Sequence, residues 1–157
     1  MRKMLGFSLV ELLVSAAILG LLASVAMPLA ELSVKRQKEA QLRQALREIR
    51  AGIDAYKQAA SSHRITLVQG QSGYPPTLVD LVAGVKDAGN PDGPKLYFLR
   101  RIPRDPFNDD DSKPASDTWG KRSFASGPDN PVDGDDVFDV YSLSAGVGIN
   151  GVAYKEW

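Results

Sequence analysis

Residues 7–27 read FSLVELLVSAAILGLLASVAM and form the longest apolar run of the chain. About 21 consecutive residues are apolar or small, apart from Glu11, and a helix of that length spans the hydrocarbon core of a bilayer. A carboxylate in hydrocarbon costs at least about 2.5 kcal/mol even on insertion scales. The sequence therefore predicts a membrane-spanning helix in which Glu11 has a positively charged partner.

Two interpretations of this segment leave Glu11 without a special role. A cleaved secretory signal would combine the basic Arg2 and Lys3, the apolar run and a small-residue cleavage site at residues 24–26. Such a signal seldom carries a glutamate in its apolar region, which argues against it. The other interpretation is an uncleaved anchor whose glutamate reaches back to the membrane interface.

A third interpretation supplies the missing cation. The only nearby basic side chains precede the apolar run and stay with the cytoplasmic headgroups. A cut between Gly6 and Phe7 would instead create an α-amino group at Phe7, one helical turn from Glu11. That amine is able to pair with Glu11 of its own chain or of a neighbouring chain.

The residues around this cut resemble a known signal. RKMLG at 2–6, followed by FSLVELLV at 7–14, resembles the class III signal of type IV pilins and type II secretion pseudopilins, and Gly6, Phe7 and Glu11 match it position by position. The resemblance implies cleavage and N-methylation of Phe7 by a prepilin peptidase/methyltransferase. It also implies that Glu11 neutralises the terminal amine of the adjacent subunit in a helical filament.

Three later stretches are similar to the major, G-type pseudopilin of type II secretion: YPPTLVDLV at 74–82, RRIPRDPF at 100–107 and DVYSLSAG at 139–146. The resemblance implies a non-enzymatic inner-membrane protein whose head lies in the periplasm. It would polymerise with copies of itself and minor pseudopilins on an inner-membrane assembly platform to drive protein export. The alternatives are a type IV pilin or minor pilin for adhesion, motility or DNA uptake, and an uncleaved membrane-anchored binding domain.

Helical periodicity continues beyond the membrane segment. Apolar residues recur at helical spacing between Leu42 and Ala60, which predicts one helix from Phe7 to about residue 61. Pro28 lacks the N–H that the helix needs at this position, so we expect a bend there. The resemblance also gives Pro28 a place, because these families keep a helix proline near this point.

The predicted fold is α+β, a long N-terminal helix packed on a small antiparallel head. A short helix is expected over 77–83, capped by Thr77 with Asp80, and strands are expected over 122–126 and 137–144. In the second strand, Val137, Asp139 and Tyr141 are predicted on one face and Phe138 and Val140 on the other. The predicted division is a leader (1–6), an apolar helix half (7–29), an amphipathic helix half (30–62) and a periplasmic head (63–157).

Charge is distributed unevenly along the chain. Residues 31–64 carry eight Lys or Arg against four Asp or Glu, whereas residues 105–139 carry ten Asp against three Lys or Arg. Neither block has the interleaved aromatics of a single-strand groove, so we expect no nucleic-acid binding. Within the basic block, the spacing of Glu39 and Arg43 predicts an ion pair along the helix.

No catalytic or metal site is predicted. His63 is the only histidine, and the chain has no cysteine. G-type pseudopilins hold a structural Ca²⁺ in a loop resembling Leu-Gly-Ala-Asp-Gly, but here residues 143–147 read LSAGV, and Gly146 replaces the ligand aspartate. A calcium site built from other aspartates stays open, although DNPVDG at 129–134 fails as an EF-hand because proline takes its third position.

The mature N-terminus provides the first test. We expect intact-mass analysis of the membrane protein to show loss of residues 1–6 and the gain of one methyl group on Phe7. An intact Met1, or a mature chain beginning at Met27, contradicts the pilin-like interpretation.

Overall fold

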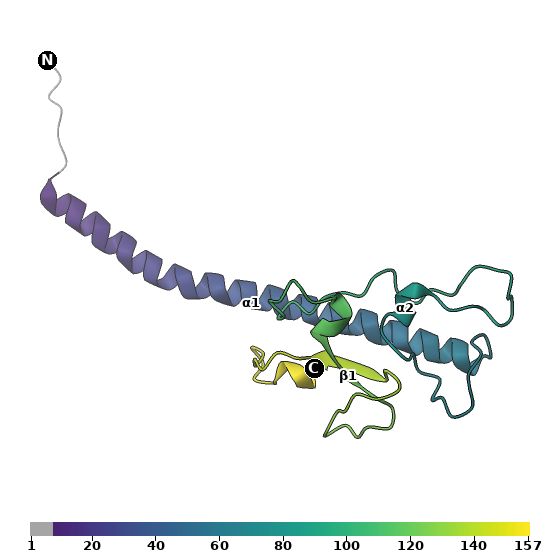
Figure 1. The fold of residues 1–157 in the computed structure, drawn as a ribbon. Helices are drawn as coiled ribbons and strands as arrows, with labels where there is room; N and C mark the ends of the chain where they lie inside the picture. The colour runs from purple at the N-terminus through teal and green to yellow at the C-terminus, as the bar shows by residue number, and fades with distance from the viewer. Residues whose placement is uncertain (1–7) are drawn as a thin grey trace, which may run out of the picture. The chain divides into compact units, whose positions relative to one another are not determined.

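The computed structural model describes residues 8–157, apart from the side chains of residues 25–28. The chain divides into two units, residues 1–37 and residues 38–157. One helix, α1 (Leu9–Ser61), supplies most of the first unit and continues into the second (Figure 1). The long helix is therefore confirmed, and its backbone stays helical through Pro28.

The C-terminal end of α1 closes in a Schellman motif. The N–H of Arg64 donates to the carbonyl of Ala59 at 2.9 Å, and the N–H of His63 donates to the carbonyl of Ala60 at 3.0 Å. His63 has φ = 57°, the left-handed conformation that glycine usually takes at this position. His63 thus lies just past the helix end, where it reverses the chain into the head.

The second part of α1 provides the core of residues 38–157. Its buried side chains follow the predicted helical stripe, and they are Leu42, Ala45, Leu46, Ile49, Ile53, Tyr56, Ala59 and Ala60. Side chains from the rest of the unit pack against this stripe, and the fully buried members among them are Leu78, Leu81, Val137 and Val140. Burial of one helix face holds these short elements together.

The short helix of the head is α2 (Asp80–Ala83), which begins three residues later than predicted. Oδ2 of Asp80 accepts hydrogen bonds from the N–H of Thr77 at 2.9 Å and from its hydroxyl at 2.8 Å. The predicted pairing is therefore present, but it closes a turn over residues 77–79 instead of opening a helix there. Gly84 ends α2 with φ = 75°, as glycine readily does.

The sheet is a two-stranded antiparallel ribbon of β1 (Trp119–Arg122) and β2 (Asp139–Ser142). A 3₁₀ turn, η1 (Ala115–Thr118), precedes it, and a second one, η2 (Tyr154–Glu156), follows it. Trp119 pairs with Ser142, and Arg122 pairs with Asp139. The α+β architecture is confirmed.

The predicted first strand, over 122–126, is wrong. Residues 123–126 form a turn in which the N–H of Ser126 donates to the carbonyl of Ser123 at 3.0 Å. The Asp136 carboxylate fixes this turn by accepting from the N–H of Phe124 at 2.8 Å and from the Ser123 hydroxyl at 2.9 Å. The strand lies earlier in the chain because Gly120 lets β1 approach the Tyr141 ring, where a Cβ would come within 2.3 Å.

The second strand is shorter than predicted, and one residue faces differently. Val140 and Ser142 are buried, while Asp139 and Tyr141 are partly exposed, so the alternation holds inside β2. Val137 was expected on the face of Asp139 and Tyr141, but it is buried. Its N–H donates to the carbonyl of Pro75 at 2.8 Å before β2 begins, so the strand periodicity does not reach it.

The dependence of the head on α1 gives a stability prediction. Ile49→Ala removes a fully buried side chain from the middle of the stripe and should lower the free energy of unfolding by about 2–5 kcal/mol. Thermal unfolding of the full chain in detergent, followed by near-ultraviolet circular dichroism, measures it. The adjacent exposed Glu48→Ala should stay within about 0.5 kcal/mol of wild type. Equal losses in both variants contradict the assignment of the core.

Candidate assembly site

The first described turn of α1 is capped by a side chain. The Ser8 Oγ accepts a hydrogen bond from the N–H of Glu11 at 3.2 Å, so Ser8 is the N-cap and Glu11 stands at the third helical position. A carboxylate in the first turn is favoured by the positive end of the helix dipole. The sequence interpretation overlooked Ser8, although its spacing to Glu11 is that of a capping box.

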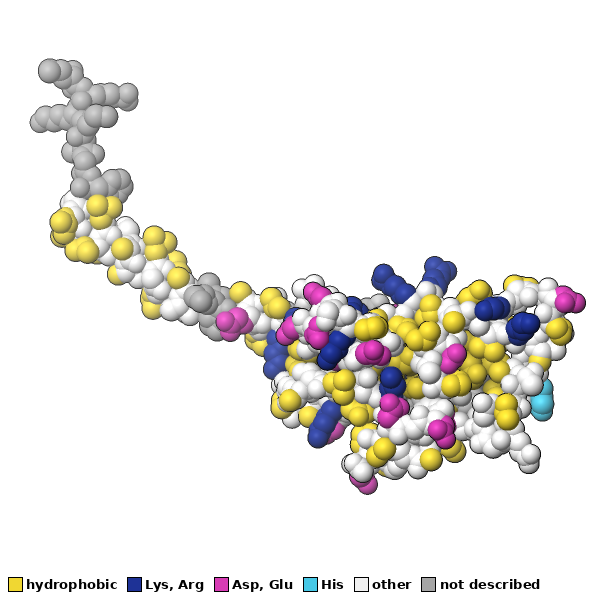
Figure 2. Space-filling model, in the orientation of Figure 1, with side chains coloured by type: hydrophobic (Ala, Val, Ile, Leu, Met, Phe, Trp, Pro, Cys, Tyr) yellow, Lys and Arg dark blue, Asp and Glu magenta, His cyan; other side chains and the backbone are white. Residues whose placement is uncertain are grey.

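The apolar surface of α1 beyond this turn has no cover within its own unit. The large apolar side chains of residues 9–22 are between 54% and 74% exposed. The most apolar 18-residue window of α1 has a mean hydropathy of 2.3, and none of it is buried (Figure 2). By length and composition this helix is able to cross a membrane. Such a surface requires lipid or other protein around it.

The predicted site residues are only partly visible. Glu11 lies in the first turn, and its side chain is exposed. Gly6 and Phe7 lie outside the described residues, as does the side chain of Pro28. Among the described residues, the Glu11 carboxylate has no hydrogen-bond or ion-pair partner.

A second carboxylate of α1, Glu39, is placed very differently. It is only 6% exposed, and its Oε1 accepts hydrogen bonds from the N–H of Ile149 at 2.8 Å and from the hydroxyl of Tyr154 at 3.1 Å. The predicted ion pair between Glu39 and Arg43 is therefore wrong. The burial of Glu39 could have been predicted from its position. It precedes Leu42 by three residues and so falls on the buried stripe of the helix.

Tyr154 also limits what the loop at residues 143–147 is able to hold. The N–H of Tyr154 donates to the carbonyl of Gly146 at 3.1 Å, and a Cβ at Gly146 would lie 2.9 Å from the Tyr154 ring. The space for an aspartate is thus taken by an aromatic ring. This loop does not fit the calcium site that the G-type resemblance implies.

The aspartate-rich segments are the other place where the sequence left a calcium site open. Over the part of the chain that the structure describes, no three Asp, Glu or His side chains gather closely enough to hold a metal ion. Several of the acidic side chains cap turns or pair with cations, as Asp136 does with Ser123 and Asp139 does with Arg50 at 2.7 Å.

The pKa of the Tyr154 hydroxyl reports on its contact with Glu39. Burial, together with the neighbouring Glu39 carboxylate, raises the pKa of Tyr154 to about 12. The unfolded chain releases the same proton near pH 10.0, so the folded state holds more protons between pH 10 and pH 12. The stability that Tyr154 contributes is complete below that window and is lost as pH rises through it.

Tyr154→Phe should show this linkage. At pH 8 the variant should lose about 1 kcal/mol of stability with the hydrogen bond to Glu39, and the loss should shrink as pH rises toward about 12. Chemical unfolding at a series of pH values measures the difference from wild type. Tyr97→Phe, at an exposed ring, serves as the matched control. A difference that is constant with pH contradicts the assigned contact.

Comparison with known proteins finds two similarities. Residues 1–27 match the prokaryotic N-terminal methylation motif. The chain is 32% identical over 158 aligned positions to the type II secretion system core protein G of Dickeya chrysanthemi, covering 96% of this chain and 94% of the relative. No solved structure matches. The extent of this similarity shows that the chain belongs to the family of the type II secretion system core protein G.

Proposed function

We propose that this chain is a structural subunit of a type II secretion pseudopilus. It is processed at Gly6, methylated at Phe7, and polymerised from the inner membrane into a helical periplasmic filament. The observation that carries the proposal is the uncovered apolar half of α1 with a single carboxylate, Glu11, at its capped end. The methylation motif and the similarity to core protein G support the same role.

The apolar half of α1 suits a subunit that moves between two environments. Lipid tails cover its side chains before assembly, and the helices of neighbouring copies cover them afterwards. Apolar surface gains little when it leaves lipid for another apolar helix, so packing alone discriminates poorly between registers. A filament built on such helices therefore requires a more specific contact.

Glu11 supplies that contact. In hydrocarbon an unpaired carboxylate is strongly unfavourable, and a partner charge with good geometry removes most of the penalty. The amine created at Phe7 is such a partner when it comes from the adjacent subunit. Registers that separate the two charges are then disfavoured, and the pair sets the axial step of the filament.

Processing and assembly of the subunit each imply a partner protein. A prepilin peptidase/methyltransferase produces the Phe7 amine, and an inner-membrane assembly platform takes up the processed subunit with minor pseudopilins. The head points into the periplasm and contributes surface, not catalysis. His63, the single histidine, serves to end α1, which supports a structural role.

Glu11→Ala tests the proposal directly. The variant should insert in the membrane as well as wild type, because the substitution removes a charge from hydrocarbon, but its sheared filament fraction should be lost. Membrane fractionation and electron microscopy of sheared filaments measure the two properties.

Glu31→Ala is the matched control, since Glu31 is an exposed carboxylate of the same helix outside the apolar run. It should assemble normally. Normal filaments from Glu11→Ala would show that the carboxylate does not direct assembly.

A further inference from the structure

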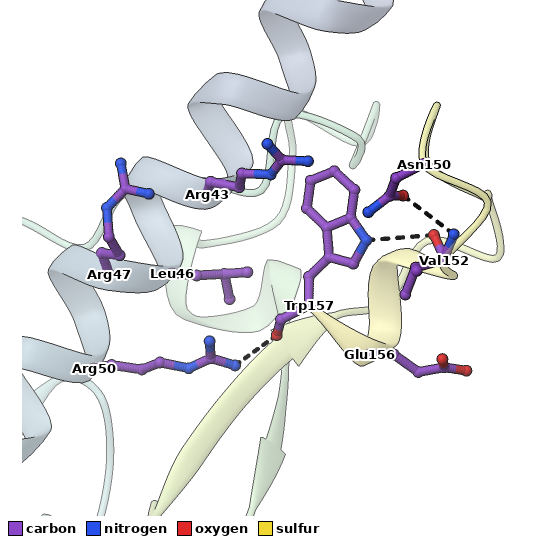
Figure 3. Close-up of a pocket in the computed structure, with 8 residues that line it drawn as sticks. All are labelled: Arg43, Leu46, Arg47, Arg50, Asn150, Val152, Glu156 and Trp157. Carbon is purple, nitrogen blue, oxygen red and sulfur yellow. Dashed lines mark hydrogen bonds between the residues drawn. The ribbon is translucent and has the colours of Figure 1, made fainter.

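A groove of about 440 Å³ lies between the second part of α1 and the C-terminal segment (Figure 3). We call it the arginine groove, and its lining residues are Arg43, Leu46, Arg47, Arg50, Asn150, Val152, Glu156 and Trp157. The three arginines recur at helical spacing on one face of α1. Val152 and the Trp157 ring add apolar surface, and Glu156 is the one acidic side chain of the lining. The groove is therefore both basic and partly apolar.

The three arginines differ in whether their N–H groups are already bonded within the chain. Arg50 is committed to its own chain, because Nε donates to Oδ1 of Asp139 at 2.7 Å and Nη2 donates to the main-chain oxygens of Val140 at 3.1 Å and Trp157 at 2.7 Å. It fastens the C-terminal segment to α1. The Arg50 guanidinium is therefore already paired within its own chain and is not available to a partner.

Arg43 and Arg47 keep their donors available. The Arg43 guanidinium stacks on the Trp157 ring, 4.3 Å from the centroid, and the indole N–H of Trp157 donates to the carbonyl of Val152 at 3.3 Å. Stacking fixes the plane of the guanidinium and leaves its N–H edge open. Neither Arg43 nor Arg47 has a hydrogen bond or an ion pair among the described residues. A pre-positioned guanidinium of this kind binds carboxylates well.

One acidic segment of the head has the complementary character. The acidic loop, residues 127–135, carries Asp129, Asp133 and Asp135, all exposed, and no Lys or Arg occurs between residues 123 and 138. In the described part of the chain no cation lies within 4.0 Å of these three carboxylates. Val132 stands beside Asp133 and is 53% exposed.

The acidic loop has a defined shape. The N–H of Val132 donates to the Ser126 hydroxyl at 2.9 Å, and its carbonyl accepts from the N–H of Ser123 at 3.0 Å. Val132 and Asp133 are therefore presented together at a fixed place. Little ordering cost remains for a contact made through them.

The other acidic run, at residues 109–111, is largely used within the chain. Asp109 pairs with Lys38 at 3.6 Å, and Asp110 pairs with Lys113 at 3.7 Å. Arg104 also donates to the carbonyls of Asp110 and Lys113. This run is a poorer ligand for a second basic surface.

We propose that the arginine groove receives the acidic loop of a second copy of this chain, with Val132 on the apolar part and Asp133 paired with Arg43 and Arg47. The groove and the loop are different surfaces of one subunit, and they do not pair within the chain. A contact of this type is heterologous, so it propagates into an open helical array instead of closing a dimer. The inference rests on the proposed function and identifies one surface through which successive heads meet.

Reciprocal charge reversal tests the contact in cells that assemble the full chain. Arg47→Glu and Asp133→Lys should each lower the sheared filament fraction by at least about fivefold, because each brings like charges together. Co-expression of the two variants should restore at least about half of the wild-type fraction. In alternating copies, every reversed groove then meets a reversed loop and every normal groove meets a normal loop.

Lys86→Glu is the control, since it makes the same charge change at an exposed residue outside the groove. It should assemble as wild type does. Melting temperatures of the purified full-length variants should lie within about 3 °C of wild type, which separates loss of the contact from loss of folding.

The outcomes separate this inference from the proposed function. If wild type assembles and Arg47→Glu assembles equally well, the groove contact is wrong while the pseudopilus role stands. If both single variants fail but co-expression does not restore filaments, the contact is again overturned, because rescue by mixing is what pairing between copies requires. If wild type forms no filament in a secretion-competent cell, the proposed function fails and this inference fails with it.

Discussion

The apolar stripe from Leu42 to Ile53 on α1 is the surface on which the rest of residues 38–157 depends. The head offers two strands of four residues each and one helix of four residues, and a two-stranded ribbon alone is marginal in water. The sequence has no cysteine with which to staple these pieces. Burial against a helix that is already formed supplies the missing core, because each short element then adds its apolar face to an existing surface. The head is therefore a layer built on α1 more than an independent domain.

The charged residues of α1 fall into two groups. Some are bonded to the head of the same chain, and Glu11 has no described partner. Glu39 and Arg50 reach the C-terminal segment, where each is satisfied by groups of the same chain at 2.7–3.1 Å. Removing one partner of such a set leaves a buried polar group without a bond, which is costly. Glu11 stands on the same helix in an apolar segment, yet no described residue satisfies its carboxylate.

The sequence predicted the elements whose signals are local and repeated. The helix and its buried stripe follow from spacing within a few residues. The pairing of Thr77 with Asp80 does too, although it closes a turn where a helix start was predicted. The errors have a different origin, since they concern residues whose environment is made by distant parts of the chain. Gly120 weakens the strand signal of β1, but the Tyr141 ring requires a glycine there. The local sequence around Glu39 predicts a surface ion pair. In the structure its carboxylate is bonded instead to Ile149 and Tyr154, which lie more than a hundred residues later in the chain. Gly146 was recognised as a departure from a metal-binding loop, but only the packing of Tyr154 explains why the loop holds its shape.

A filament built from such subunits needs both cohesion and a defined register, and the distribution of charge suits that requirement. Exposed ion pairs contribute about 0–1 kcal/mol each, so a contact through Arg43, Arg47 and Asp133 adds little to the total stability of the array. Its effect on register is larger, because a misaligned head separates the acidic loop from these arginines and loses the attraction at every step. The apolar half of α1 contributes most of the binding energy between subunits but does not select one register. The charged contacts select the register but contribute little binding energy. Because different parts of the subunit supply the two properties, accurate alignment does not require strong contacts between the heads.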